Sequence, residues 1–343
     1  ELDEIYNELV KLRHGMGRKL GYEGYTPLGY DRMHRNCYTE ADVDSFRAAV
    51  QQYLVPVVKR MYMQQAKRLG FDFPLSFADK DLIFRSGNPV PVGNTAEILA
   101  NGTRFYNELS PETAEFWNHM MENEMMDVEA KPGKSAGGYC TRIHALKTPF
   151  IFSNFNGTAA DVDVLTHEAG HAFEAYSAYK TQQIAEYTYS TSEINEIHSM
   201  SMEHFTYPWM DLFFGEDTDR RLYSHLFGAL SVIPYLVSVD EFQHRVFEKP
   251  DMTAEERKAV WRSIERKYQP WRDYDGNEFL ESGGFWMQKQ HIFLYPFYYV
   301  DYALAQTCAF MYYKRMCEDK QEAWNGYLEL CKKGGSLGYF ETL

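Results

Sequence analysis

The feature that most constrains this chain is the pentapeptide His-Glu-Ala-Gly-His at positions 167–171. Apolar residues recur at helical spacing through residues 161–179, so this segment is predicted to be an α-helix. Two histidines four positions apart lie on one helix face, about 6 Å apart along the axis, and both imidazoles can reach one zinc ion. Glu168 lies about 100° around the helix from His167, where it can approach a metal-activated water without being a ligand. The motif predicts a zinc centre rather than an ordinary surface pair of histidines.

A catalytic zinc site needs a third protein ligand and an open fourth position. Downstream, Ser190 and Glu193 have the spacing of a capping box, which predicts the start of a second helix. Glu196 falls in its second turn, 25 residues after His171, a separation that suits two antiparallel helices. Glu193 and His198 are alternative third ligands, and the local pattern leaves the choice open.

Two further carboxylates are candidates for orienting the ligands. Asp163 precedes His167 by four positions, and Glu203 follows Glu196 by seven, so each shares a helix face with a ligand. A carboxylate that accepts a hydrogen bond from a ligating histidine holds the ring in place. The alternative is that both residues are solvated helix charges.

The rest of the chain has mainly helical periodicity, so we expect a mainly α fold. The exception is a segment rich in glycine and proline before the zinc helix, with a short predicted strand at 149–155. No linker divides the chain, which predicts one domain over residues 1–343. Its expected parts are a helical wall segment (1–131), a β insertion (132–158) and a zinc-binding helical core (159–343).

Composition narrows the function classes. The net charge of −14 argues against a surface that binds nucleic acid, because phosphate contacts need clustered lysine and arginine. Five cysteines without a C-x-x-C pair argue against a disulfide framework and favour a cytoplasmic location. We find no secretion signal and no apolar run approaching the length of a membrane span, so no membrane partner is expected. The chain opens at Glu1 inside an amphipathic pattern, without an initiator methionine, which suggests a piece of a longer protein.

At these motifs the sequence resembles the M3 family of zinc oligopeptidases, and most closely its oligoendopeptidase F branch. The resemblance implies a helical zincin-type catalytic domain lining a deep channel, with a small β-sheet or hairpin beside the zinc helix. Much of the N-terminal domain that forms one channel wall in the family is expected to be absent from this chain. Three blocks carry the resemblance: residues 166–172, 193–199 and 291–306.

The resemblance also implies which residues act. It assigns one zinc ion per chain to His167, His171 and Glu196, and the role of catalytic general base to Glu168. The implied reaction is the hydrolysis of internal bonds in short unfolded peptides by a water that zinc activates. The strand at 149–155 is then a candidate for pairing with the extended substrate backbone.

A histidine and several tyrosines close over the substrate in this family. His291 matches the histidine, and Tyr302 matches a tyrosine; both are candidates for stabilising charge on the substrate carbonyl. Tyr295, Tyr298 and Tyr299 are candidate substrate-binding residues, in a stretch where the thimet-type branch is glycine-rich and one residue longer.

Two other functions fit parts of the sequence. One is a zinc- and peptide-binding fragment without catalytic activity, because the channel wall is incomplete. The other is a di-iron carboxylate oxidoreductase, since Glu168-x-x-His171 and Glu241-x-x-His244 both match the helix-bundle di-iron pattern. The di-iron interpretation leaves His167 and the His291 block without a role. The oligomeric state is open.

Overall fold

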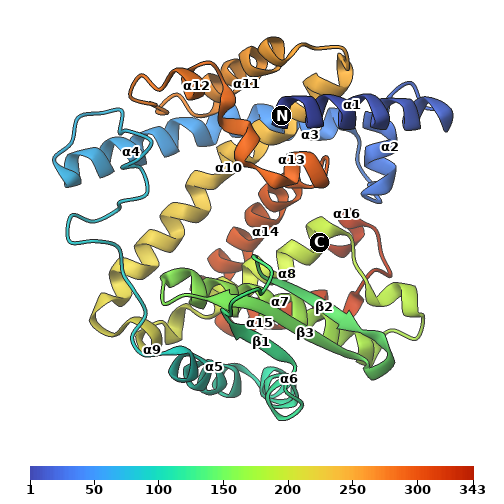
Figure 1. The fold of residues 1–343 in the computed structure, drawn as a ribbon. Coiled ribbons are helices and arrows are strands. Elements are labelled where there is room, and N and C mark those ends of the chain that lie inside the picture. Colours follow the sequence, from blue (N-terminus) through green and yellow to red (C-terminus); the bar gives the residue numbers. More distant parts are fainter. The chain divides into compact units, whose positions relative to one another are not determined.

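The computed structural model describes residues 1–343 and consists mainly of α-helices with one three-stranded sheet (Figure 1). This confirms the predicted mainly α fold class. The chain divides into two compact units. Unit 1 comprises Glu1–Asn88 and Leu226–Ala303, and unit 2 comprises Pro89–His225 and Leu304–Leu343. Two of the three crossings between the units fall inside the continuous helices α10 (Thr218–Glu248) and α14 (Tyr299–Glu318). A boundary between units that falls inside a helix has no turn or linker residues to mark it in the sequence. This explains why the sequence suggested a single domain.

Unit 1 is helical, and local sequence features explain where some of its helices begin or change geometry. Thr253 accepts a hydrogen bond from the Glu256 amide and so caps the start of a helix. The periodic stretch 41–69 is two helices joined by a π-helical turn, Val50–Leu54. Pro56 has no amide hydrogen to continue the helical ladder, and the widened turn directly precedes it. The other elements of unit 1 are α1 (Leu2–Lys19), α2 (Tyr25–Arg32), α3 (Glu40–Ala49), α4 (Val55–Leu69), α11 (Ala254–Tyr268), α12 (Glu278–Glu281), the 3₁₀ helix Gly284–Gln288 and α13 (Gln290–Leu294).

Unit 2 carries the sheet and the two helices of the predicted metal site. The helix expected to begin at a Ser190–Glu193 capping box begins instead at Ser192, with Thr191 as N-cap. The Ser190 hydroxyl bonds the Asn195 side chain at 2.6 Å, so the capping-box prediction was wrong. The helices of unit 2 are α5 (Thr95–Leu109), α6 (Pro111–Glu122), α7 (Ala159–Thr181), α8 (Ser192–Phe205), α9 (Asp211–Phe214), α15 (Lys320–Lys333) and α16 (Tyr339–Thr342), with 3₁₀ turns at His144–Leu146, Ala185–Thr188, Tyr207–Trp209 and Gly215–Asp217.

The sheet has the order β1-β3-β2 and lies against α7 (Figure 1). β1 (Met126–Glu129) is parallel to β3 (Thr148–Phe155), and β2 (Tyr139–Ile143) is antiparallel to it. The β region therefore begins at Met126, before the expected boundary at 132, because β1 is a strand of only four residues and precedes the glycine-rich segment that marked the boundary in the sequence. β3 has a partner on each edge, so it cannot pair with a substrate as predicted for 149–155; β2 and β1 hold the outer edges.

One apolar run was overlooked in the sequence. Residues 222–239 contain no Asp, Glu, Lys or Arg. By length and composition alone, the helical stretch Asp211–Glu248 is apolar enough to cross a membrane, with a mean hydropathy of 1.5 over its most apolar window. The core helices of soluble proteins meet the same criterion, and 39% of this window is buried within the chain. The absence of a membrane partner stays a prediction.

Candidate metal centre

Two histidines of α7 and one glutamate of α8 converge in unit 2. His167 and His171 lie one turn apart with ring centroids separated by 5.0 Å. Glu196 Oε2 is 3.3 Å from His167 Nε2 and 3.5 Å from His171 Nε2, and one ligand atom from each residue lies within 4.8 Å of the others. Tetrahedral zinc with bonds of about 2.05 Å places its ligand atoms about 3.3 Å apart. The spacing of the three side chains therefore fits one zinc ion, with the fourth position available to water or substrate.

The competing third ligands of the sequence analysis do not join this group. Glu193 and His198 are buried on α8, with 1% and 0% of their surfaces exposed, and neither belongs to the convergent cluster. Burial lowers the pKa of His198 to about 3, so the ring is neutral. Glu196 is thus the α8 residue that the backbone directs toward the two histidines.

Glu203 lies where a ligand-orienting carboxylate is expected. Its Oε1 is 2.7 Å from His167 Nδ1, the ring nitrogen that does not face Glu196. Burial alone would raise the pKa of Glu203, but hydrogen bonds from His167 and His225 outweigh it and lower the pKa to about 2. A carboxylate held ionised in this way retains the His167 tautomer that presents Nε2 to a metal. Ser199 supports Glu196 similarly, with its hydroxyl donating to Oε2 at 3.1 Å.

A further polar layer lies behind Glu203. His225 Nε2 is 2.8 Å from Glu203 Oε2, and His225 Nδ1 is 2.6 Å from the Tyr207 hydroxyl. Asp163 does not contact His167; it forms an ion pair with Arg221 and lies 3.7 Å from His225. The predicted contact of Asp163 with the ligand His167 is therefore not formed, and Asp163 lies instead next to His225, which bonds Glu203. The sequence did not identify His225, Arg221 or Tyr207 as part of the site, because no motif links them to the histidine pair.

Glu168 differs from the other carboxylates of the site. Only 8% of the residue is exposed, yet its carboxylate has no hydrogen-bond partner in the protein. Burial raises the pKa of the Cys140 thiol on β2, and the negative charge of Glu168 raises it further. The Glu168 carboxylate therefore lies on the side of α7 that faces the sheet. A carboxylate without a protein partner is available to accept a proton from water.

The predicted closing residues form a second cluster, located in unit 1. The His291 ring stacks on Tyr298 at 6.0 Å and lies 5.1 Å from Tyr299 and 6.4 Å from Tyr302. Tyr295 completes the group, with its ring 6.0 Å from His291. Tyr295 is 58% exposed, whereas Tyr299 is buried and burial raises its pKa to about 12. The structure thus groups the five aromatic residues named by the sequence, in the unit that does not contain the metal cluster.

The second di-iron motif is already satisfied without a metal. The Glu241 carboxylate accepts hydrogen bonds from Lys267 at 2.8 Å and from Tyr268 at 2.6 Å. His244 contacts the Tyr30 hydroxyl at 3.1 Å. A lysine on the carboxylate competes with a cation for the same oxygen, so this pair does not resemble an iron site.

Glu203 offers the first test of the metal centre. Replacing Glu203 with Ala is expected to weaken zinc binding by about 10- to 100-fold, because His167 loses the acceptor that orients it. Glu203→Gln keeps an acceptor without the charge and should fall between Ala and the unchanged protein. Zinc affinity is measured by competition with a chromogenic chelator. Glu186→Gln, outside the cluster, is the control; equal affinities in all four proteins would contradict an orienting role.

Comparison with known proteins places this geometry in context. The profile of peptidase family M3 matches residues 106–343. Among curated proteins, an oligoendopeptidase F homolog of Borreliella burgdorferi is 26% identical over 235 residues, which cover 66% of this chain and 38% of that protein.

Solved structures match over nearly the whole chain. PZ peptidase A in complex with an inhibitor is 51% identical, with a TM-score of 0.96, and the match covers 99% of this chain and 60% of that one. A provisionally assigned oligoendopeptidase F from Bacillus anthracis is 47% identical, with a TM-score of 0.89, and 58% of its chain is covered. The chain therefore spans between about two fifths and three fifths of the length of these relatives.

Proposed function

Because the chain belongs to peptidase family M3, we propose that it forms the catalytic part of a zinc-dependent oligoendopeptidase that cleaves internal bonds of short unfolded peptides. The observation that carries the proposal is the convergence of His167, His171 and Glu196 at the spacing of a tetrahedral zinc site. This chain spans only part of the length of these relatives, so their activity is proposed for it and not established.

In the proposed reaction, His167, His171 and Glu196 would hold a zinc ion, whose Lewis acidity would lower the pKa of a water and polarise the peptide carbonyl. Glu168 accepts the proton of the attacking water as its oxygen bonds to the carbonyl carbon. Glu168 then passes this proton to the departing amine as the carbon–nitrogen bond breaks. Its lack of a protein hydrogen-bond partner suits a group that must change protonation state twice in each turnover.

Substrate backbone recognition is proposed for β2 instead of β3. β2 is an outer strand of the sheet, and its Cys140 lies near the carboxylate of Glu168. An extended peptide that pairs with this edge is held by main-chain hydrogen bonds, which predicts weak preference for particular side chains.

Tyr302 is proposed to donate a hydrogen bond to the carbonyl oxygen as charge develops on it, with His291 as a second donor. Replacing Tyr302 with Phe is therefore expected to lower kcat by about 10- to 100-fold with a smaller change in KM. Steady-state cleavage of a quenched fluorescent peptide measures both constants. Tyr53→Phe, an exposed tyrosine, is the control. A change in KM alone would make Tyr302 a ground-state binding residue.

Metal removal tests the function itself. A protein loaded with one zinc ion per chain is expected to cleave a quenched fluorescent peptide, to lose at least about a hundredfold in rate after chelation, and to recover with added zinc. Metal content is measured in the same samples. Zinc binding without cleavage would support the alternative of a non-catalytic fragment, and two irons per chain would support the oxidoreductase.

We also propose a cytoplasmic location without a nucleic-acid or membrane partner. All five cysteines are free thiols, which suits a reducing compartment. The net charge of −14 disfavours binding to polyanions.

A further inference from the structure

A small cavity in unit 1 carries an unbalanced positive charge. Its volume is about 250 Å³, and it is lined by α1, α2 and the segment that follows α13. Arg13 and Arg32 line it, and none of the lining residues is acidic. The chain as a whole has 49 acidic against 35 basic residues, so two arginines facing a cavity without a carboxylate run against its overall charge.

The guanidinium groups of these arginines retain unused hydrogen-bonding capacity. Arg13 donates through Nη2 to the Phe293 carbonyl at 2.5 Å, while its buried Nη1 has no partner. Burial, together with the nearby charge of Arg32, lowers the pKa of Arg13. Arg32 is exposed and forms no ion pair. A guanidinium binds a carboxylate through paired N–H donors, and a partly buried arginine without a counter-ion favours such a ligand.

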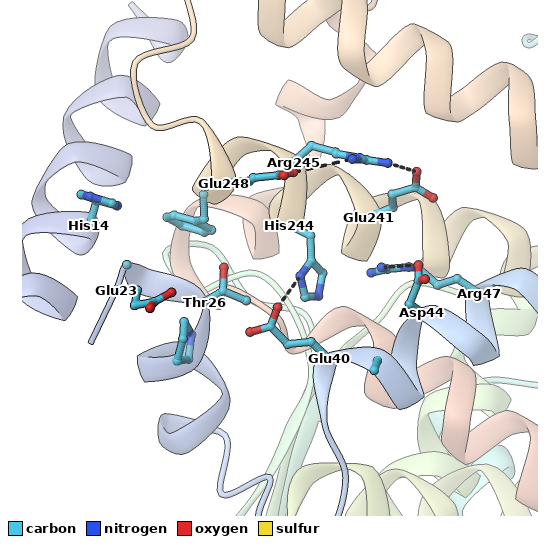
Figure 2. Close-up of a pocket in the computed structure, with 14 residues that line it drawn as sticks. His14, Glu23, Thr26, Glu40, Asp44, Arg47, Glu241, His244, Arg245 and Glu248 are labelled. Carbon is cyan, nitrogen blue, oxygen red and sulfur yellow. Dashed lines mark hydrogen bonds and ion pairs between the residues drawn. The ribbon is translucent and has the colours of Figure 1, made fainter. Parts of the chain in front are cut away.

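A larger cavity of unit 1 shows the contrast (Figure 2). Its volume is about 600 Å³, and each of its two arginines already has a carboxylate partner. Arg47 pairs with Asp44 at 3.0 Å, and Arg245 lies 3.6 Å from Glu248 (Figure 2). His244 is 3.7 Å from Glu40. The arginines of that cavity are therefore not available to a carboxylate ligand, whereas the smaller cavity has no internal counter-ion.

Another part of the cavity lining comes from residues 294–298. Tyr295 and Tyr298 line the cavity, and both rings also contact His291. One cavity wall therefore consists of residues proposed to contact substrate. A ligand in the cavity would touch the same segment from the side of α1 and α2.

Phe297 holds this segment in one conformation. It adopts a left-handed backbone with φ of 68°, which is strained for a residue with a side chain. Its ring is fully buried, its amide donates to Gln243 Oε1 at 3.0 Å, and its carbonyl accepts from Arg35. A Cβ at Gly29 would lie 2.6 Å from the Phe297 ring, so the glycine allows the ring to reach α2. These contacts build the cavity before a ligand arrives, which reduces the entropy lost on binding.

We propose that this cavity binds a carboxylate group of the peptide substrate, held by Arg13 and Arg32 beside Tyr295 and Tyr298. The proposal rests on the proposed peptidase function and specifies one part of its substrate preference. The carboxylate has two possible sources, the C-terminus of a short peptide or an Asp or Glu side chain, and both present the same planar anion.

Binding to the zinc-free full chain tests the proposal without requiring cleavage. Two pairs of fluorescently labelled peptides are compared by anisotropy: one pair differs in a C-terminal carboxylate or amide, the other in an internal Glu or Gln. The carboxylate member of at least one pair is expected to bind about tenfold more tightly. The pair that discriminates identifies the source of the carboxylate.

Arginine variants assign this preference to the cavity. Arg32→Gln changes an exposed side chain and is expected to lower the ratio of affinities for the carboxylate and neutral peptides about fivefold. Arg13→Gln is expected to lower this ratio about tenfold. Lys11→Gln, an exposed residue of α1, is the control and should retain the full preference. Equal binding within both pairs, or variants that weaken carboxylate and amide peptides alike, would overturn the proposal. Carboxylate preference in a zinc-loaded chain that cleaves nothing would refute the peptidase function and leave this site in place.

Discussion

Replacing Glu168 with Gln is expected to lower kcat at least about a hundredfold while zinc remains bound at one ion per chain. The amide has nearly the shape of the carboxylate but cannot accept the proton of the attacking water. Glu168 lies outside the three-residue ligand cluster, so the change removes no metal contact. Stopped or continuous assays of a quenched fluorescent peptide give kcat, and metal analysis of the same sample gives zinc content.

Two variants bracket this experiment. Glu186→Gln makes the same chemical change outside the cluster and should leave both kcat and zinc content unaltered. His171→Ala removes a ligand and should lose zinc and activity together. A zinc-loaded Glu168→Gln protein with undiminished kcat would show that another group accepts the proton, and the proposed mechanism would then fail.

The ligand cluster was predictable because helix geometry converts sequence spacing directly into spatial proximity. His167 and His171 are separated by one turn, and Glu203 follows Glu196 by two, so both relations appear in the sequence. His225 escaped detection because it comes from α10, whose contact with α8 depends on tertiary packing. The choice of Glu196 over Glu193 also depended on helix rotation, which the local pattern left open.

The fold was predictable in its class but not in its division or its strand order. Helical periodicity identifies helices, whereas the crossings between the units inside α10 and α14 have no local signature. The pattern at 149–155 identified a strand, but a central strand and an edge strand of the same composition look alike in one sequence. The strand proposed to pair with the substrate is therefore β2, an outer strand, and not β3.

Gly170, between the two histidines, was noted in the sequence only as a letter of the motif, and the structure explains why glycine is required there. A Cβ at this position would lie 2.6 Å from Ser199 Cα and 2.7 Å from the His198 carbonyl oxygen. Both atoms belong to the backbone of α8 and cannot rotate away as a flexible side chain could. The absence of a side chain at Gly170 therefore sets how closely α8, and with it Glu196, approaches α7.

We expect Gly170→Ala to destabilise the chain and the metal site together. Alanine gains about 1 kcal/mol in helix propensity over glycine, but overpacking against a backbone costs about 3 kcal/mol, which leaves a net loss of about 2 kcal/mol. Zinc affinity should fall at least about tenfold, because α8 must shift and carry Glu196 away from the histidines. Gly15→Ala is the matched control: it lies inside α1 with no atom within 4 Å of the added Cβ, so the propensity gain should appear alone. Denaturant unfolding and zinc titration of both variants separate the two contributions; a Gly170→Ala protein as stable as Gly15→Ala, with unchanged zinc affinity, would mean that the close approach of α7 and α8 does not determine the site.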